Sequence, residues 1–199
     1  MRFDEWVLGI FIFTACIGVM LLILISSPQK AHADALPATG IVSSEPLLDQ
    51  WIEALCEDRD IPPEIVFAII ERESGCDPSV VNKETGAVGL MQIVPGTWAV
   101  QTAAICAEMK RDVYLDPLDP FDNAFVGVRL LAYLMEGRDI ELALDCYALG
   151  EGGAAERMVA MERYEPTGWT QAVLARAAEL EKEWPDKGNP GGPPYKQEV

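Results

Sequence analysis

A glutamate at the end of an apolar helical stripe is the first residue in this sequence whose type and position could do chemistry. The stretch from Ile61 to Ser74 carries an apolar stripe at helical spacing, formed by Ile65, Val66, Ile69 and Ile70. The next helical step of three or four residues reaches Glu73. A carboxyl group in partly apolar surroundings keeps its proton to higher pH, as a general acid for glycosidic cleavage requires. A helix-terminal glutamate that turns out into water would give the same pattern.

A glycine-containing segment follows, over residues 85–97. It places Gly86 and Gly89 where the backbone must bend or approach closely, and then Met91 and Gln92 ahead of a proline. A neutral amide beside apolar groups can hydrogen-bond the hydroxyl and acetamido groups of a sugar without bringing in a charge. The alternative is a turn that leads into a core helix, with Gln92 simply exposed.

Four segments, in this order, resemble the signature of the soluble-lytic-transglycosylase family. They are residues 73–78 followed by Asn82, residues 86–97, residues 119–123 with Gly127, and residues 143–150. The family's patterns read E-S-G-x-x-P, G-A-x-G-L-M-Q-x-x-P-x-T, D-P-x-x-N-x-x-x-G and A-L-x-x-Y-N-x-G. The resemblance covers about residues 50–153 and implies an all-α, lysozyme-like fold of the goose type.

The resemblance implies a peptidoglycan lytic transglycosylase with Glu73 as its single acid/base. Glu73 would protonate the β-1,4 glycosidic oxygen between N-acetylmuramic acid (MurNAc) and N-acetylglucosamine (GlcNAc). The resulting carboxylate would take the proton of the sugar's own C6 hydroxyl, which closes on the anomeric carbon to give 1,6-anhydro-MurNAc. An ordinary glycosidase needs two carboxylates, and an intramolecular nucleophile at high effective concentration removes the need for the second.

The resemblance also implies four substrate-binding residues, Ser74, Met91, Gln92 and Tyr147. Ser74 would position the substrate or the glutamate, Met91 and Gln92 would line the sugar site, and the Tyr147 hydroxyl would reach the catalytic carboxyl. By residue type alone, Ser74 could instead bond a helix carbonyl, and Tyr147 could be a core aromatic with a solvated tip. Ala148 stands where the family usually has asparagine, so we expect the loop that follows to differ.

Other functions stay open at this point. A muramidase of the same fold would need a carboxylate to activate water, and Asp112, Asp116 and Asp119 lie in loop-like sequence. A non-catalytic murein-binding module of a secretion, conjugation or phage assembly would gain little from burying a carboxyl group at position 73. A membrane-anchored helical scaffold without sugar binding would explain the helices but not the four ordered segments.

Composition excludes several other classes. The 199 residues include 15 Lys or Arg and 32 Asp or Glu, a formal net charge of −17. Such an acidic chain argues against nucleic acid as a partner, because binding to nucleic acid requires clustered positive charges. The single histidine, His32, lies in linker-like sequence, so a Ser-His-Asp triad, a Cys-His dyad and a His-rich metal site are all excluded. We expect no metal and no cofactor.

The N-terminal residues predict a membrane segment. Residues 6–25 are uncharged and nearly all apolar, and are long enough to cross a bilayer as a helix. The small-residue triplet 31–33 alternatively offers a signal-peptide cleavage site. We therefore expect a transmembrane anchor or signal segment over 1–26, a flexible linker over 27–45, the catalytic domain over 46–184 and a disordered tail over 185–199. The expected location is the cell envelope, either anchored in the inner membrane facing the periplasm or exported after cleavage near Ala33.

Helices must position the candidate residues, and apolar spacing predicts five of them. They cover residues 48–55, 61–74, 121–132 with Asp119 as cap, 140–149 ending at Gly150, and 169–184. The resemblance says nothing about residues 154–184, to which we assign helical packing only.

Four cysteines lie in the expected catalytic domain, namely Cys56, Cys76, Cys106 and Cys146. They permit two disulfides in an oxidising compartment. The alternative is that they are small buried residues. Their spacing includes no C-x-x-C, so we expect no zinc site.

Overall fold

A computed structural model describes residues 48–161 and 163–183 of the chain. All regular elements in these two ranges are helices, apart from isolated β-bridges. The helices are α2 (Leu48–Asp58), α3 (Pro63–Ser74), α4 (Pro95–Met109), α5 (Pro120–Met135), α6 (Ile140–Ala160) and α7 (Gly168–Glu183). The predicted all-α class is therefore confirmed for the described residues.

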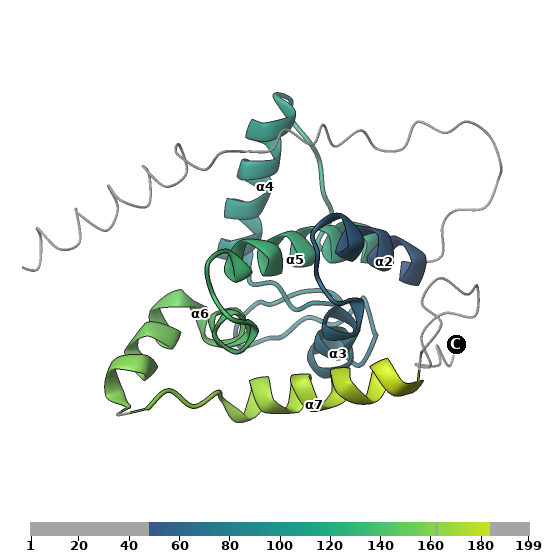
Figure 1. Ribbon diagram of the computed structural model, residues 1–199. Helices are drawn as coiled ribbons and strands as arrows, with labels where there is room; N and C mark the ends of the chain where they lie inside the picture. The colour runs from purple at the N-terminus through teal and green to yellow at the C-terminus, as the bar shows by residue number, and fades with distance from the viewer. Residues whose placement is uncertain (1–47, 162, 184–199) are drawn as a thin grey trace, which may run out of the picture. The chain divides into compact units, whose positions relative to one another are not determined.

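Helix α3 is the central element of the domain. Residues 64–70 along it are buried, and Val66, Phe67 and Ile69 are completely so. Figure 1 shows α2 and α5 on one side of α3 and α7 running along the other, with α6 beside them and α4 extending away. A helix buried around most of its circumference offers its last turn as a fixed platform. That last turn carries Glu73.

The ends of α3 follow from its sequence. Pro62 and Pro63 start the helix, where a missing N–H costs nothing. Gly75 ends it in the left-handed conformation, with φ of 62°, and its N–H donates to the carbonyl of Glu71 at 3.0 Å. Glycine reaches this conformation without a Cβ penalty. The helix therefore ends at Ser74, one residue after Glu73.

The segment from Gly75 to Val94 is a compact loop that lies against α5. Val88 forms bridges with Val81 and with Ile93, which fold the loop back on itself. Gly89 has φ of 79°, and a Cβ there would collide with the side chain of Asn123 and the carbonyl of Pro117. Glycine is thus required at this position by both its backbone angle and its neighbours.

Four of the five predicted helices match observed ones closely, and two differences stand out. The sequence pattern did not delimit α4, on which only Gln101 and Ile105 are buried, so that it carries no continuous apolar stripe. Gly150 does interrupt α6, with φ of 74° and ψ of 157°, but the helix resumes and runs to Ala160. The predicted end at Gly150 is in fact a kink.

The predicted disulfides are not found. Cys56, Cys76, Cys106 and Cys146 are all unpaired. Cys56 is buried in the main core and Cys146 in a second apolar cluster, so they occupy separate apolar surroundings. Burial raises the pKa of the Cys56 thiol to about 12 and that of Cys76 to about 11, as expected of cysteines that serve as small apolar residues.

The predicted anchor, linker and tail fall outside the described residues. Within the described ranges, no helix has both the length and the apolar character needed to cross a membrane.

Candidate active site

Glu73 lies in the last turn of α3 and is half-buried. Its Oε1 accepts a hydrogen bond from the indole Nε1 of Trp169 at 2.9 Å, so the side chain does not simply turn out into water. Burial raises the pKa of the carboxyl, and this outweighs the opposing effects of the Trp169 hydrogen bond and the positive charge of Arg72. The direction of the shift is the one that the helical stripe predicted.

Tyr147 of α6 lies close to Glu73 but does not bond it. Its hydroxyl donates to the backbone carbonyl of Met91 at 2.6 Å. Burial raises the pKa of Tyr147, and the negative charge of Glu73 raises it further. The predicted contact between the hydroxyl and the catalytic carboxyl is therefore replaced by a contact with the loop backbone. A neutral phenol is the form that can make this donation.

Met91 is completely buried, so its side chain does not line an open surface. Its sulfur lies against Gly127 of α5, where any Cβ would collide with it. Its backbone N–H donates to Oδ1 of Asn123 at 2.8 Å. The Asn123 amide in turn donates to the carbonyls of Val88 and Pro117, at 3.0 and 2.8 Å. The two motif residues Gly127 and Asn123 thus fix the loop onto α5.

Gln92 and Ser74 use their polar groups locally. The Gln92 backbone has φ of 47°, and its amide nitrogen donates to the carbonyls of Val80 and Gly89, at 3.0 and 2.8 Å. The Ser74 hydroxyl donates to the carbonyl of Ile70 at 3.0 Å. This bond to a helix carbonyl is the alternative that the residue type of Ser74 left open. The structure therefore gives the side-chain donors of Gln92 and Ser74 partners within the loop and within α3.

Sequence reasoning did not find two features that complete the site. The first is Trp169, which stacks on Tyr147 with ring centroids 6.0 Å apart and planes at 15°. The helical spacing of residues 169–184 placed Trp169 on the buried face of its helix, but nothing in it pointed to Glu73. The second is the buried carboxyl of Asp145, which holds the start of α7.

Two of the three aspartates considered for a water-activating role are occupied in local turns. Asp119 caps α5 by accepting from the N–H groups of Phe121 and Asp122. Asp116 accepts from the N–H of Leu118 at 2.9 Å. Within the described ranges, no three His, Cys, Asp or Glu side chains cluster as metal ligands would.

Comparison with known proteins adds a family and two solved structures. The family model described as the transglycosylase SLT domain matches residues 50–165. The structure of the 70 kDa soluble lytic transglycosylase of Escherichia coli is similar with a TM-score of 0.55 and 26% identity, over 70% of this chain and 25% of that one. An inactive mutant of the lytic transglycosylase Slt of Pseudomonas aeruginosa gives a TM-score of 0.58 at 18% identity, over 68% and 24%.

This chain therefore spans about a quarter of the length of either structure. A comparison with curated protein sequences gave no match.

Proposed function

This chain belongs to the transglycosylase SLT domain family, and on that premise we propose that it is a peptidoglycan lytic transglycosylase acting in the cell envelope. The observation that carries the proposal is the half-buried Glu73, whose pKa is raised by burial at the end of a rigid helix. A carboxyl that keeps its proton to higher pH than usual is suited to general acid catalysis.

The proposed reaction needs one carboxyl group and no water. Protonated Glu73 gives its proton to the β-1,4 glycosidic oxygen between MurNAc and GlcNAc, and the bond from that oxygen to the anomeric carbon breaks. The C6 oxygen of the same MurNAc then bonds to the anomeric carbon, and its proton passes to the Glu73 carboxylate. The products are a free GlcNAc hydroxyl and a 1,6-anhydro-MurNAc end, and Glu73 returns to its protonated form.

We also propose that Ser74, Met91, Gln92 and Tyr147 form the substrate-binding surroundings of Glu73. The side chain of Met91 is completely buried, so Met91 would contribute through its backbone carbonyl, which holds the hydroxyl of Tyr147 in place. The amide nitrogen of Gln92 is committed to two carbonyls of the loop, so its amide oxygen is the atom suited to accept from a sugar hydroxyl.

A muramidase is the nearest alternative, since it shares the acid and differs in using water. It would need a second carboxylate to activate that water. Asp116 and Asp119 already accept backbone hydrogen bonds in the turn before α5, which favours the intramolecular route. The domain limits, with an anchor or signal over 1–26 ahead of the catalytic domain, remain part of the proposal.

The test is digestion of purified murein sacculi by the full chain in mild detergent. Glu73→Gln removes the acid, and Glu84→Gln, at an exposed loop position, is the matched control. We expect the wild type and the Glu84→Gln variant to release fragments with 1,6-anhydro ends, one water lighter than hydrolysis products. Glu73→Gln should release them far more slowly. Hydrated muramic acid ends would instead identify a muramidase. Binding to sacculi without any release would identify a binding module.

A further inference from the structure

Helix α7 supplies the hydrogen bond that Glu73 receives, although the helix begins after the last residue that the family model matches. Helices α3 and α7 pack against each other, and Figure 1 shows α7 passing below α3. Trp169 lies in the first turn of α7, and its Nε1 donates to Oε1 of Glu73 at 2.9 Å. The two residues are 96 positions apart in the chain, so the contact exists only because α7 lies against α3.

The indole of Trp169 is itself held in place. One face stacks on the ring of Tyr147, with the planes only 15° apart. Tyr147 cannot swing away freely, because its hydroxyl is bonded to the Met91 carbonyl. The direction of the indole N–H is therefore set by aromatic packing and does not depend on the hydrogen bond alone.

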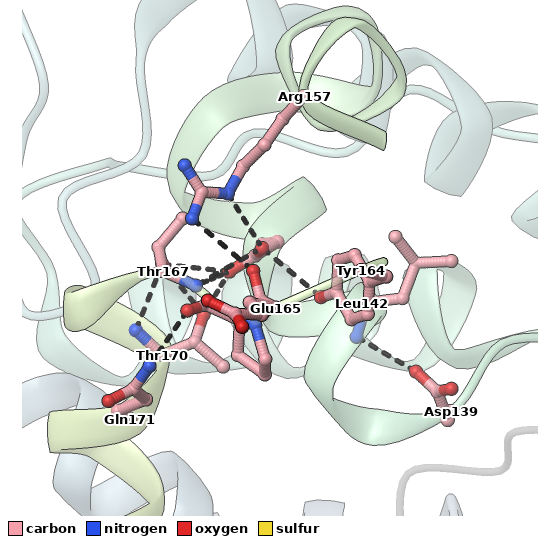
Figure 2. A network of polar contacts seen from close by, with 10 residues as sticks. Asp139, Leu142, Arg157, Tyr164, Glu165, Thr167, Thr170 and Gln171 are labelled. Carbon is pink, nitrogen blue, oxygen red and sulfur yellow. Dashed lines mark hydrogen bonds and ion pairs between the residues drawn. The ribbon is translucent and has the colours of Figure 1, made fainter. Parts of the chain in front are cut away.

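The backbone on either side of Trp169 is fixed by a buried carboxyl. Asp145 of α6 is completely buried, and its Oδ1 accepts from the hydroxyl of Thr167 at 2.7 Å, from the Thr167 N–H at 3.1 Å and from the hydroxyl of Thr170. Its Oδ2 accepts from the Tyr164 hydroxyl at 3.1 Å. Figure 2 shows Tyr164, Thr167 and Thr170 converging in this network. Thr167 and Thr170 flank Trp169 in sequence, so the network holds the turn that carries the indole.

A second attachment lies two turns further along α7. Arg176 donates from Nε to Oε2 of Glu71 at 2.7 Å and from Nη2 to Oε1 at 3.2 Å. Glu71 lies only two residues before Glu73 on α3. The part of α7 that carries Trp169 is thus fixed to α6 by the Asp145 network at its start and to α3 by this ion pair two turns later.

We propose that Trp169 is a positioning residue for the acid, fixing Glu73 so that Oε2 is the oxygen that carries and delivers the proton. The proposal rests on the function proposed above. An indole N–H can only donate, so the oxygen that it binds must present a lone pair, and the acid proton belongs on the other oxygen. Among the described residues, no hydrogen bond is found to Oε2 of Glu73, which leaves that atom for substrate.

The pKa of Glu73 can report whether the hydrogen bond from Trp169 is present. Arg72 on the same helix and the neutral hydroxyl of Tyr147 on α6 are the titratable groups that interact with its carboxyl, while Arg176 on α7 is paired with Glu71. The indole N–H stabilises the charged carboxylate and so lowers the pKa of Glu73 against the effect of burial. Removing only that N–H should raise the pKa of Glu73 further.

The test uses the full chain with two changes at one position. Trp169→Phe removes the N–H and part of the ring, while benzothienylalanine at position 169 keeps the two-ring shape and replaces the N–H by sulfur. Trp51→Phe is the matched control, because Trp51 also donates its indole N–H, there to the Phe121 carbonyl at 3.4 Å. The pKa of Glu73 is read by carbon-13 NMR of its carboxyl, assigned by its loss in Glu73→Gln, beside the pH profile of anhydro-fragment release.

We expect both changes at position 169 to raise the pKa of Glu73 and to move the alkaline limb of the pH profile upward. In both variants kcat should fall roughly tenfold to a hundredfold, as for a misplaced catalytic group. KM should change less than kcat. Trp51→Phe should leave the pKa of Glu73 unchanged. An unchanged pKa in the folded benzothienylalanine variant would overturn the proposal. A raised pKa, in a protein whose wild type releases no anhydro fragments, would support the contact and overturn only the proposed function.

Discussion

Glu73 on α3 and Asp145 on α6 are both withdrawn from water, and their pKa values move in opposite directions. Burial opposes the charge on both. Asp145 is completely buried, yet hydrogen bonds from Thr170, Thr167 and Tyr164 hold its pKa below the ordinary value. Glu73 is only half-buried but accepts a single side-chain hydrogen bond, and its pKa is raised.

The difference shows that the number of donors, more than the depth of burial, decides what a withdrawn carboxyl can do. A carboxylate surrounded by donors stays charged and binds its neighbours firmly. That is the role of Asp145, which joins α6 to the start of α7. A carboxyl with one donor keeps an oxygen for its own proton. The two groups are connected, because the turn that Asp145 fixes carries the donor of Glu73.

Substitution of the acid should give the largest change in activity and a small change in stability. We expect Glu73→Gln to lower the rate of fragment release about 10³-fold, the range for loss of a general acid. The amide still offers an oxygen to the Trp169 N–H, so the free energy of unfolding should change by less than about 1 kcal/mol. Digestion rates and urea unfolding measure the two effects. Activity retained by Glu73→Gln would remove Glu73 as the acid.

Substitution of the structural carboxylate should give the largest change in stability. Asp145→Ala leaves the donors of Tyr164, Thr167 and Thr170 without their acceptor in a buried site. We expect a loss of about 3–5 kcal/mol in the free energy of unfolding, as for breaking a buried charged network.

Asp139→Ala is the matched control on the same helix. Asp139 is an exposed N-cap whose side chain accepts from the N–H of Leu142, so the expected loss is about 1 kcal/mol. Urea unfolding of both variants measures the difference. Equal losses would contradict the central role of the Asp145 network.

A single donor of the Asp145 network can be removed while its shape is kept. Thr170→Val replaces a completely buried hydroxyl by a methyl group, and we expect it to cost about 1–2 kcal/mol in the free energy of unfolding. The pKa of Asp145 should rise in this variant, because one of the donors that hold it down is gone. Thr170→Ser keeps the hydroxyl and should leave that pKa low. Carboxyl NMR titration of the two variants distinguishes lost hydrogen bonding from lost packing.

The smallest expected effect is a difference of sign in the pH dependence of stability. The lowered pKa of Asp145 contributes stability that is present above its ordinary value of 3.8 and is lost as pH falls through the folded pKa. The raised pKa of Glu73 contributes stability that is present below 4.5 and is lost as pH rises through the folded pKa.

Urea unfolding between pH 3 and 7 should therefore separate the two groups. The deficit of Asp145→Asn relative to the wild type should shrink towards pH 3. The stability of Glu73→Gln relative to the wild type should instead improve towards pH 7. Parallel pH curves for the two variants would contradict the opposite pKa directions.

Local pattern predicted the helix that carries the acid. The proline pair, the apolar stripe and Gly75 define α3 from neighbouring residues alone, and they place Glu73 at the end of the buried face. Asp119 was likewise recognisable as the cap of α5. The ordered motif segments predicted the family, because spacing along the chain is what such motifs record.

The same reasoning did not find α4, since a helix with two buried residues leaves little periodic signal. The family resemblance implied that the Tyr147 hydroxyl reaches the carboxyl of Glu73, whereas in the structure this hydroxyl donates to the Met91 carbonyl. The paired cysteines were expected from their number and compartment, but pairing depends on whether two sulfurs meet in the folded core.

The sequence by itself therefore indicated five of the six helices in the described residues, the buried faces of those five and Glu73 as the candidate acid. Only the tertiary structure decided what meets that acid. Trp169 reaches Glu73 across 96 positions, and Asp145 reaches Thr167 across 22. Helical periodicity records that a side chain faces the core but not which partner it finds there. That choice is made by the packing of α3, α6 and α7 together, because all three must bury their apolar faces in one shared core.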